Sequence, residues 1–412
     1  MRPRRRGRET DRVPADAARA FLIHQESSPM KPSAYPRVRP FLLGLVLAGL
    51  PALASADRLE ELPLPAGGGT AGVSGIAADG TVVGTLWPVG EVLRWRPGQA
   101  PENLGGDTYT LENVIPLISA DGATIVASYY FWTPGSDVPE AAPAIWDGSQ
   151  WQRMPGIVLG DTTPFGIADD GSALAGAAYP AESPPPGGFV SLLPWTWTAA
   201  AGQVVLDLPA GQEAGQAWAV SSGATRAAGF TVAATGATRH GVRWEGTAAH
   251  PILDGEGAAV GQAIACNSDC SVIVGAGVEG SGGSPQAWRW TAATGVTYLG
   301  AVAGALPEAT YYAFDTDEAG TMIVGSYYTI DPLLGASNRG FVWTAEAGIV
   351  DLVDFLAARG IDYGEGFGDL VVNAMTRDGR KLLLNGMDGD FQRRRAVVHL
   401  DGEAIFADGF EP

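Results

Sequence analysis

Short apolar segments alternate with tight turns along nearly the whole chain after residue 57. One recurring signal is a turn followed by a β-branched strand that ends in a small residue, as in Asp79-Gly80 leading through Val82 and Val83 to Gly84. Asp-Gly favours a hairpin because glycine accepts a positive φ and aspartate can cap its own turn. The signal recurs at Asp79-Gly80, Asp121-Gly122, Asp170-Gly171, Ser222-Gly223, Asp269-Cys270, Ala319-Gly320 and Asp378-Gly379.

A second recurring signal is an apolar strand that ends in tryptophan. The six tryptophans are Trp95, Trp146, Trp197, Trp244, Trp290 and Trp343, and the seventh place falls on His399. Two ordered signals that stay in phase over seven units exclude chance recurrence in a glycine-rich chain. We expect these tryptophans to pack between units rather than to form a binding site.

Each unit of about fifty residues has room for about four short strands, which cannot bury their apolar faces alone. The 57 glycines, 29 prolines and 17% of charged residues also favour short strands joined by turns over long helices. Seven such units over residues 57–404 predict an all-β fold, a seven-bladed β-propeller. The alternative is an open β-solenoid, which would expose two terminal faces.

The beginning of this region predicts how the ring would close. Residues 62–67 (LPLPAG) resemble residues 206–211 (LDLPAG), the outer segment of the third unit. We therefore expect an N-terminal strand to pair with the last blade. One interruption is expected in the sixth unit, where Asp351 to Gly360 has Leu352, Phe355 and Leu356 at helical spacing before a terminal glycine.

An apolar run precedes the repeats, from Phe41 to Ala54. It follows Lys31, Arg37 and Arg39 and ends in Ala54-Ser55-Ala56. This order predicts a secretory signal peptide over residues 30–56, cleaved before Asp57, because the run is too short for a membrane span. Residues 1–29 are then a start codon placed too early or, alternatively, a disordered leader.

The region after residue 56 is strongly acidic. Residues 1–56 hold 10 of the 26 Lys and Arg and 4 of the 45 Asp and Glu, so the remainder has a formal net charge of −25. Such a surface repels phosphate backbones and anionic lipid, which disfavours nucleic-acid and membrane-surface binding. We expect an exported monomer, extracellular or periplasmic, with no membrane span in its mature form.

The chain has two cysteines, Cys266 and Cys270, at the first tight turn of the fifth unit. Residues four apart can face each other across a short hairpin, and export favours oxidation, so a disulfide is predicted. A metal site is the alternative, but no third cysteine or nearby histidine completes a ligand set. Closing so short a loop should contribute little stability.

The repeat resembles the HAF-repeat extracellular proteins of bacteria. The resemblance covers residues 59–400 and rests on the turn leading into Val-Val-Gly, the strand ending in tryptophan and the Leu-Gly segment after it. It is closest at residues 340–348 (GFVWTAEAG). It implies an exported repeat protein and supplies no catalytic residues. The tail at residues 405–412 is either a sorting signal or the end of the last strand.

Candidates for binding chemistry are few. Asp315 and Asp317 precede a glycine as in the first part of a calcium loop, but no glutamate closes the loop, and a solvated acidic turn is the simpler interpretation. The pairs Tyr129, Tyr130 and Tyr327, Tyr328 follow the second strands of units two and six. Alternation directs one member of each pair inward. With Trp132 they could stack on sugar rings, or they simply cover a blade edge.

No catalytic motif is present, and the three histidines after residue 57, His240, His250 and His399, have no nucleophile or carboxylate partner in sequence. We predict no catalytic residue and no cofactor other than calcium. The favoured function is a secreted, non-catalytic scaffold or binding module for a surface, a glycan or a protein. The alternative is a propeller-type hydrolase or lyase, which would need two ionisable groups converging near the axis.

Overall fold

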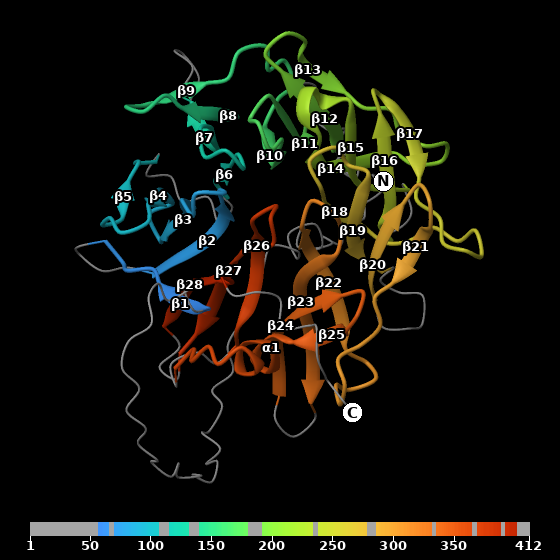
Figure 1. Cartoon of the computed structure of the whole chain (residues 1–412). Coiled ribbons are helices and arrows are strands. Elements are labelled where there is room, and N and C mark those ends of the chain that lie inside the picture. The colour runs from blue at the N-terminus through green and yellow to red at the C-terminus, as the bar shows by residue number, and fades with distance from the viewer. Residues whose placement is uncertain are drawn as a thin grey trace, which may run out of the picture. The chain divides into compact units, whose positions relative to one another are not determined.

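In the computed structural model, the repeat units form four-stranded antiparallel sheets, or blades, around a common centre (Figure 1). The structure describes residues 57–65, 70–106, 115–131, 140–179, 192–233, 238–277, 286–331, 335–364, 369–388 and 392–401, all within one compact unit. The predicted leader, the signal peptide, Trp132 and the tail at 405–412 lie outside these residues.

Blades 1 to 4 follow one another along the chain. Blade 1 contains β2 (Thr70–Ile76), β3 (Val82–Trp87), β4 (Glu91–Trp95) and β5 (Glu102–Asn103). Blade 2 contains β6 (Leu117–Ile118), β7 (Ile125–Phe131), β8 (Glu140–Trp146) and β9 (Trp151–Arg153). Blade 3 contains β10 (Thr162–Ile167), β11 (Ala173–Ala178), β12 (Leu193–Thr198) and β13 (Gly202–Val205). Blade 4 contains β14 (Ala214–Val220), the 3-10 turn η2 (Ser222–Ala224), β15 (Arg226–Val232), β16 (His240–Glu245) and β17 (Ala248–Pro251).

Blades 5 to 7 complete the ring. Blade 5 contains β18 (Ala263–Cys266), β19 (Val272–Ala276), β20 (Ala287–Thr291) and β21 (Gly295–Tyr298). Blade 6 contains β22 (Thr310–Thr316), β23 (Met322–Asp331), β24 (Gly335–Thr344), β25 (Gly348–Asp351) and the inserted helix α1 (Leu352–Ala358). Blade 7 contains β26 (Val371–Met375), β27 (Lys381–Met387), β28 (Arg393–His399) and, from the other end of the region, β1 (Arg58–Glu61). One bridge, Ala276 to Tyr312, joins blades 5 and 6 into a single larger sheet.

The predicted closure by the N-terminal strand is confirmed. Strand β1 pairs antiparallel with β28, with Leu59 opposite Val398 and Glu61 opposite Ala396. The backbone N–H of Leu62 extends the pairing by donating to the carbonyl of Arg395 at 3.0 Å. The last blade is therefore completed by the first strand of the described chain.

The hydrophobic core is divided among the seams between blades. Each of the seven buried apolar clusters joins two consecutive blades, and one of them, with Leu62, Val73, Trp95, Leu383 and Val397, joins blade 7 to blade 1. Because the last blade buries apolar side chains against the first, the described repeats leave no terminal apolar face. The chain is a closed seven-bladed β-propeller, and the open solenoid is excluded.

The seven recurring turns share one backbone conformation. In each turn the backbone N–H of one residue donates to the carbonyl of the residue three positions earlier, as Gly80 does to Ala77. The donating residue has a positive φ in every blade: Gly80, Gly122, Gly171, Ala224, Cys270, Gly320 and Gly379. In blade 4 this position is Ala224 (φ 54°), one residue after the predicted Gly223, which also has a positive φ of 65°. Ala224 and Cys270 are the two non-glycine residues with positive φ in the part of the chain described.

The repeat tryptophans hold equivalent places on the third strands. Trp95 lies opposite Val82, Trp197 opposite Leu174, and Trp244 opposite Ala227. The indole N–H groups of these three donate to Pro63, Pro155 and Asp207, carbonyls that follow the outer strand of the preceding blade, at 2.7 to 2.8 Å. They therefore pack between blades.

The seventh tryptophan place belongs to Val398, not to His399. In blade 1 the carbonyl of Thr81 closes the turn, and the next residue, Val82, lies opposite the repeat tryptophan. In blade 7 the carbonyl of Lys381 closes the turn, and the next residue, Leu382, lies opposite Val398. Since side chains alternate between the two faces of a sheet, the shift of one residue directs His399 to the opposite face. The spacing between tryptophans could not reveal this shift, because the connections between strands vary in length.

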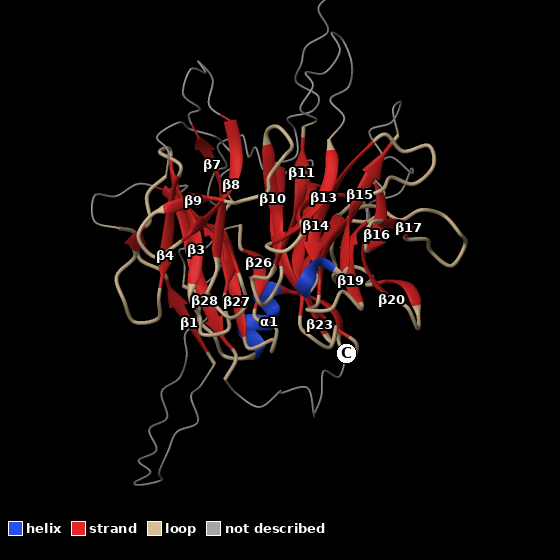
Figure 2. Cartoon of the chain, turned by 90° about the horizontal axis from the view of Figure 1, so that it is seen from above, coloured by secondary structure: helices blue, strands red, loops and turns tan. Residues whose placement is uncertain are grey.

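The predicted helix in the sixth unit is confirmed as α1 (Figure 2). The carboxylate of Asp351 caps it by accepting from the N–H of Val353, and Leu352, Phe355 and Leu356 bury their side chains against blades 6 and 7. After α1, Arg359 forms a buried ion pair with Asp57 at 2.7 Å. The insertion thereby holds the residue that precedes β1. Among the described residues no helix is long and apolar enough to cross a membrane.

Candidate functional site

The seven positive-φ turns are joined to one another around the ring. Bonds between consecutive turns link Ala78 N–H to Ala120, Asp121 N–H to Asp169, Gly223 N–H to Ser172 Oγ, Arg226 to Asp269, Ser268 Oγ to Glu318, Glu318 N–H to Arg377, and Lys381 Nζ to Ala78. The second residue takes part in this continuous ring of bonds in six of the seven turns, and the turn of blade 4 takes part through Gly223 and Arg226.

Arg377 of blade 7 extends from this ring across the centre of the molecule. Its Nε donates to both carboxylate oxygens of Asp169 in blade 3, at 3.1 and 2.9 Å. Its Nη1 donates to Asp315 Oδ1 and to the carbonyl of Thr316 in blade 6, each at 3.0 Å. The Arg377 guanidinium thus connects blade 7 to its neighbour, blade 6, and to blade 3 on the other side of the ring.

Asp315 holds the other side of this cluster. Its second oxygen accepts from the N–H of Met375 at 2.9 Å, which ties blade 6 to blade 7. Burial raises the pKa of Asp315, and Arg377 opposes that shift. Burial alone would lower the pKa of Arg377, but the charges of Asp315 and Asp169 outweigh it and raise that pKa. Arg377 is therefore permanently charged and lies between the two carboxylates.

The predicted pair Asp315 and Asp317 does not form a calcium loop. The carboxylate of Asp317 caps its own turn by accepting from Thr321 N–H at 2.7 Å and Thr321 Oγ1 at 2.6 Å. Asp315 faces Arg377 instead, so the interpretation as a solvated acidic turn fits Asp317 and is wrong for Asp315. Among the described residues, no three His, Cys, Asp or Glu side chains are placed to hold a metal ion.

Aromatic side chains form a continuous row on blade 2. The ring of Tyr129 lies 5.2 Å from that of Phe131 and 6.1 Å from that of Trp151, nearly parallel to the latter at 27°. Trp151 in turn lies 5.5 Å from Trp146. Arg153 lies over Phe131 at 5.6 Å and pairs with Glu140 at 2.7 Å. All four residues are partly buried: Trp146 and Trp151 pack against the apolar cluster between blades 1 and 2, and the Trp151 indole N–H donates to the carbonyl of Leu104 at 3.0 Å. We call Tyr129, Phe131, Trp146 and Trp151 the blade-2 row.

Tyr130 does not belong to this row. It follows Tyr129 in the strand and points to the opposite face, where burial and the nearby charge of Asp161 raise its pKa. The two tyrosines therefore lie on opposite faces of the blade, as strand alternation predicts.

The equivalent tyrosines of blade 6 have a different role. Tyr327 is 3% exposed, stacks on Tyr311 at 5.3 Å, and donates its hydroxyl to Asp351 Oδ2 at 2.6 Å. Burial and this bond raise the pKa of Tyr327. Tyr327 is the inward member of its pair and is not available to stack on a ligand, because it supports the residue that caps α1. Its neighbour Tyr328 points outward and is 40% exposed.

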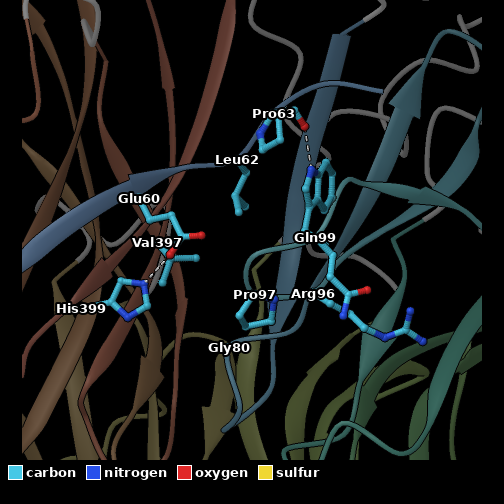
Figure 3. A pocket seen from close by; sticks show the side chains of 10 residues that line it. Glu60, Leu62, Pro63, Gly80, Arg96, Pro97, Gln99, Val397 and His399 are labelled. Carbon is cyan, nitrogen blue, oxygen red and sulfur yellow. Dashed lines mark hydrogen bonds and ion pairs between the residues drawn. The ribbon is translucent and has the colours of Figure 1, made fainter. Parts of the chain in front are cut away.

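A small pocket lies at the seam where β1 closes the ring (Figure 3). Glu60, Leu62, Val397 and His399 line one side, and Trp95, Pro97 and Gln99 of blade 1 line the other. His399 Nε2 lies 3.1 Å from Glu60 Oε2, and burial lowers the pKa of His399. This carboxylate partner lies 339 residues away in the chain, so the sequence could not reveal the pair. His240 and His250 lie on β16 and β17 of blade 4.

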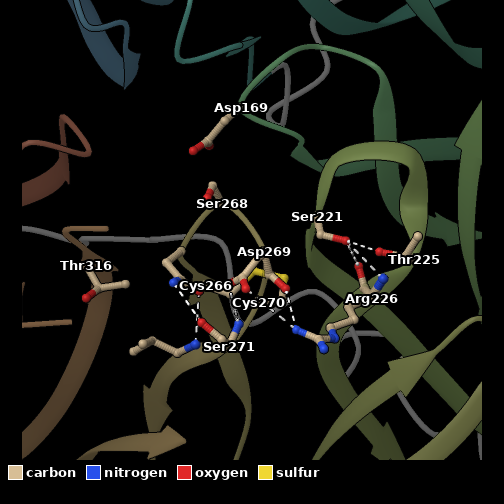
Figure 4. Close-up of a disulfide and its surroundings, with 12 residues drawn as sticks. Asp169, Ser221, Thr225, Arg226, Cys266, Ser268, Asp269, Cys270, Ser271 and Thr316 are labelled. Carbon is tan, nitrogen blue, oxygen red and sulfur yellow. Dashed lines mark hydrogen bonds and ion pairs between the residues drawn. A yellow bond between two sulfur atoms is a disulfide. The ribbon is translucent and has the colours of Figure 1, made fainter. Parts of the chain in front are cut away.

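The predicted disulfide between Cys266 and Cys270 is present in the turn of blade 5 (Figure 4). Its turn is held on both sides, by Arg226 bonded to the carbonyl of Asp269 at 3.1 Å and by Glu318 bonded to Ser268. The disulfide therefore lies within the hydrogen-bonded ring of turns.

Sequence reasoning missed Arg377 and Asp169, which are the central charged pair. Both occupy the second position of a turn, next to the Asp-Gly signal, where the other blades carry Ala78, Ala120, Ser222, Ser268 and Glu318. Aligning the seven turns residue by residue would have shown one arginine and two acidic residues at a position otherwise small and neutral.

Comparisons with known proteins support the fold. No family model and no curated protein matches the chain. Among solved structures, the β-propeller domain of the Trilobed protease from Pyrococcus furiosus is similar over 83% of this chain and 99% of that one, with 11% identity and a TM-score of 0.51. A prolyl endopeptidase is similar over 80% of this chain with 11% identity and a TM-score of 0.51, and the match covers 48% of that protein, about half its length. These likenesses show the propeller fold.

Proposed function

We propose that this protein is an exported, non-catalytic propeller that binds an extracellular glycan along the blade-2 row. The observation that carries the proposal is the succession of contacts among four aromatic rings, of which Tyr129 and Phe131 extend beyond the seam that holds Trp146 and Trp151, with a charged pair beside Phe131. Contiguous aromatic surface that stays exposed is typical of a binding site.

The chemistry of the row suits a sugar chain. Aromatic faces carry partial negative charge, so the C–H groups of a sugar ring pack against them favourably. Arg153 and Glu140 supply a donor and an acceptor for hydroxyl groups beside Phe131. The strongly acidic surface disfavours anionic polymers, so we propose a neutral or cationic glycan.

The arrangement at the axis favours binding over hydrolysis. A hydrolase of the kind considered above needs two carboxylates with a substrate between them. Asp169 and Asp315 converge near the axis, but Arg377 lies between them and bonds to both. Export is supported by the disulfide in blade 5, the predicted signal peptide and the resemblance to HAF-repeat extracellular proteins.

The test is a binding screen of the mature protein, residues 57–404, against neutral, cationic and anionic polysaccharides by affinity electrophoresis and calorimetry. We expect a neutral or cationic polymer to bind, and Tyr129→Ala and Phe131→Ala each to weaken binding about tenfold, roughly 1.4 kcal/mol. Tyr298→Ala is the matched control, since Tyr298 is 45% exposed on the outer strand of blade 5. Undiminished binding by a folded Tyr129→Ala variant would reject the site. Release of shorter oligosaccharides would favour the hydrolase.

A further inference from the structure

The innermost strands share a feature that the blade-2 row does not explain. Six of the seven carry one extra residue, a β-bulge, at the same place relative to the turn. The bulged residues are Ser74, Phe165, Trp218, Ile264, Phe314 and Asn373. Bulges redirect a side chain and are concentrated near binding and active sites.

The bulged side chains face the axis of the ring. An innermost strand pairs with the second strand on one edge and is covered by neighbouring blades on both faces, so its remaining edge faces the centre (Figure 1). The residue before each bulge, such as Ala217 or Ala313, is buried, while all six bulged residues are partly exposed. Adjacent strands approach closely here, because a Cβ on Gly166 would lie 2.4 Å from the carbonyl oxygen of Trp218.

The bulged residues form a wall around the axis that is apolar on one side and polar on the other. Blades 3 to 6 contribute Phe165, Trp218, Ile264 and Phe314, with Phe165 and Trp218 stacked at 5.8 Å. Tyr312 stacks on Phe314 at 6.4 Å. Trp218 is fixed by its indole N–H, which donates to Gln216 Oε1 at 2.9 Å. Blades 7 and 1 contribute Asn373 and Ser74, and the Ser74 hydroxyl donates to the carbonyl of Pro116 in blade 2 at 2.7 Å.

Arg377 closes the axis at the level of the turns. Its Nε and Nη1 are bonded to Asp169, Asp315 and Thr316, whereas Nη2 has no partner among the residues the structure describes. The two carboxylates compensate the charge of the guanidinium, so Nη2 can donate to a neutral oxygen but does not attract an anion.

From this geometry we propose a second binding site, at the axis, for a single uncharged sugar ring. The aromatic side of the wall fits the C–H face of the ring, and the Asn373 amide N–H groups and Arg377 Nη2 can donate hydrogen bonds to its hydroxyl groups. An anionic sugar is disfavoured because Asp169 and Asp315 lie next to Arg377. The site is independent of the blade-2 row and shares no residue with it.

The test measures binding of glucose, galactose, mannose and N-acetylglucosamine, with glucuronate as the anionic comparison, by calorimetry and tryptophan fluorescence on the mature protein. We expect saturable binding of at least one neutral sugar, a fluorescence change that is absent in Trp218→Phe, and at least tenfold weaker binding in Phe314→Ala and Trp218→Ala. The variant Phe131→Ala, on the blade-2 row, should bind the sugar as the wild type does.

Three outcomes would overturn the proposal: no saturable binding of any neutral sugar, equal binding of glucuronate, or unchanged affinity in a folded Trp218→Ala variant. Trp218→Phe keeps a ring in place and remains informative if Trp218→Ala does not fold. Loss of polysaccharide binding in Phe131→Ala with monosaccharide binding intact would show that the two sites are separate. Loss of both in Phe131→Ala would contradict an axial site.

Discussion

Arg377 is the side chain that compensates the charge at the centre of the ring. It bonds to carboxylates of blades 3 and 6 from a turn of blade 7. Replacing it with methionine should lower the free energy of unfolding by roughly 3–5 kcal/mol, because Asp169 and Asp315 are left facing each other without a cation. Guanidinium denaturation followed by circular dichroism measures this loss.

The matched control for this prediction is Arg380→Met in the same turn, where the side chain is exposed. That change should stay within about 0.5 kcal/mol of the wild type. Adding Asp169→Asn and Asp315→Asn to Arg377→Met should restore part of the loss, because the uncompensated charges are removed. Equal stability of the two methionine variants would contradict a central role for Arg377.

Two turn positions use an L-residue where the other blades use glycine. Ala224 and Cys270 have φ of 54° and 52°, in the left-handed region. Ala224→Gly should therefore stabilise the protein by about 0.5–1 kcal/mol, which thermal unfolding would detect. The pair Cys266→Ala, Cys270→Gly should likewise be more stable than Cys266→Ala, Cys270→Ala by a similar amount. If glycine confers no advantage at either site, strain in these turns is not a source of instability.

At the residue scale, the sequence predicted what depends on local chemistry. The turns around Gly80 and Gly379 and the disulfide follow from short motifs, and each is present. The sequence could not predict the bond from Arg377 to Asp169, 208 residues apart, because it depends on the ring being closed. The register of His399 was missed by one residue, since spacing between units includes connections of variable length.

The strand β1 is the element that closes the ring, and charged pairs add to its backbone pairing with β28. Glu60 faces His399, Glu61 pairs with Arg394, and Arg58 lies 3.0 Å from Asp401. The buried Arg395 donates through Nε to the carbonyl of Leu62 at 2.9 Å. The seam between blades 7 and 1 therefore combines an apolar cluster with polar bonds.

This seam should weaken in mild acid. Burial, assisted by the charge of Arg58, lowers the pKa of His399 below its value in the unfolded chain, and Glu60 opposes the shift. The unfolded state then binds more protons below about pH 6.5, so stability conferred by neutral His399 is lost as the pH falls through and below that value. Urea unfolding at several pH values should show a steeper decline for the wild type than for His399→Gln.

The control for the pH prediction is His250→Gln, on the outer strand β17 of blade 4 and away from the seam. It should reproduce the pH dependence of the wild type. Above about pH 7 the difference in pH slope between His399→Gln and the wild type should vanish, because His399 is neutral in both states there. An unchanged acid slope in His399→Gln would remove His399 from the account.

At the scale of the whole molecule, the number of blades, their order and the closing strand could be predicted, because the two phased signals repeat along the chain. The candidate sites could not. The blade-2 row arises because Tyr129 and Trp151 occupy one face of a blade, whereas the equivalent Tyr327 of blade 6 is buried between blades 5 and 6 and bonded to Asp351. The axial wall arises from bulges, which leave no clear mark in the sequence.

Both proposed sites depend on a ring that closes through β1 and unfolds as one block. The most direct test is hydrogen exchange by mass spectrometry on the mature protein and on a variant lacking residues 57–65. A closed ring predicts that the deletion lowers the melting temperature and removes exchange protection from β28, which loses its partner strand, and from β2, whose apolar seam with blade 7 loses Leu62. Unchanged protection of β28 in the deletion variant would contradict closure by β1 and the cooperative ring with it.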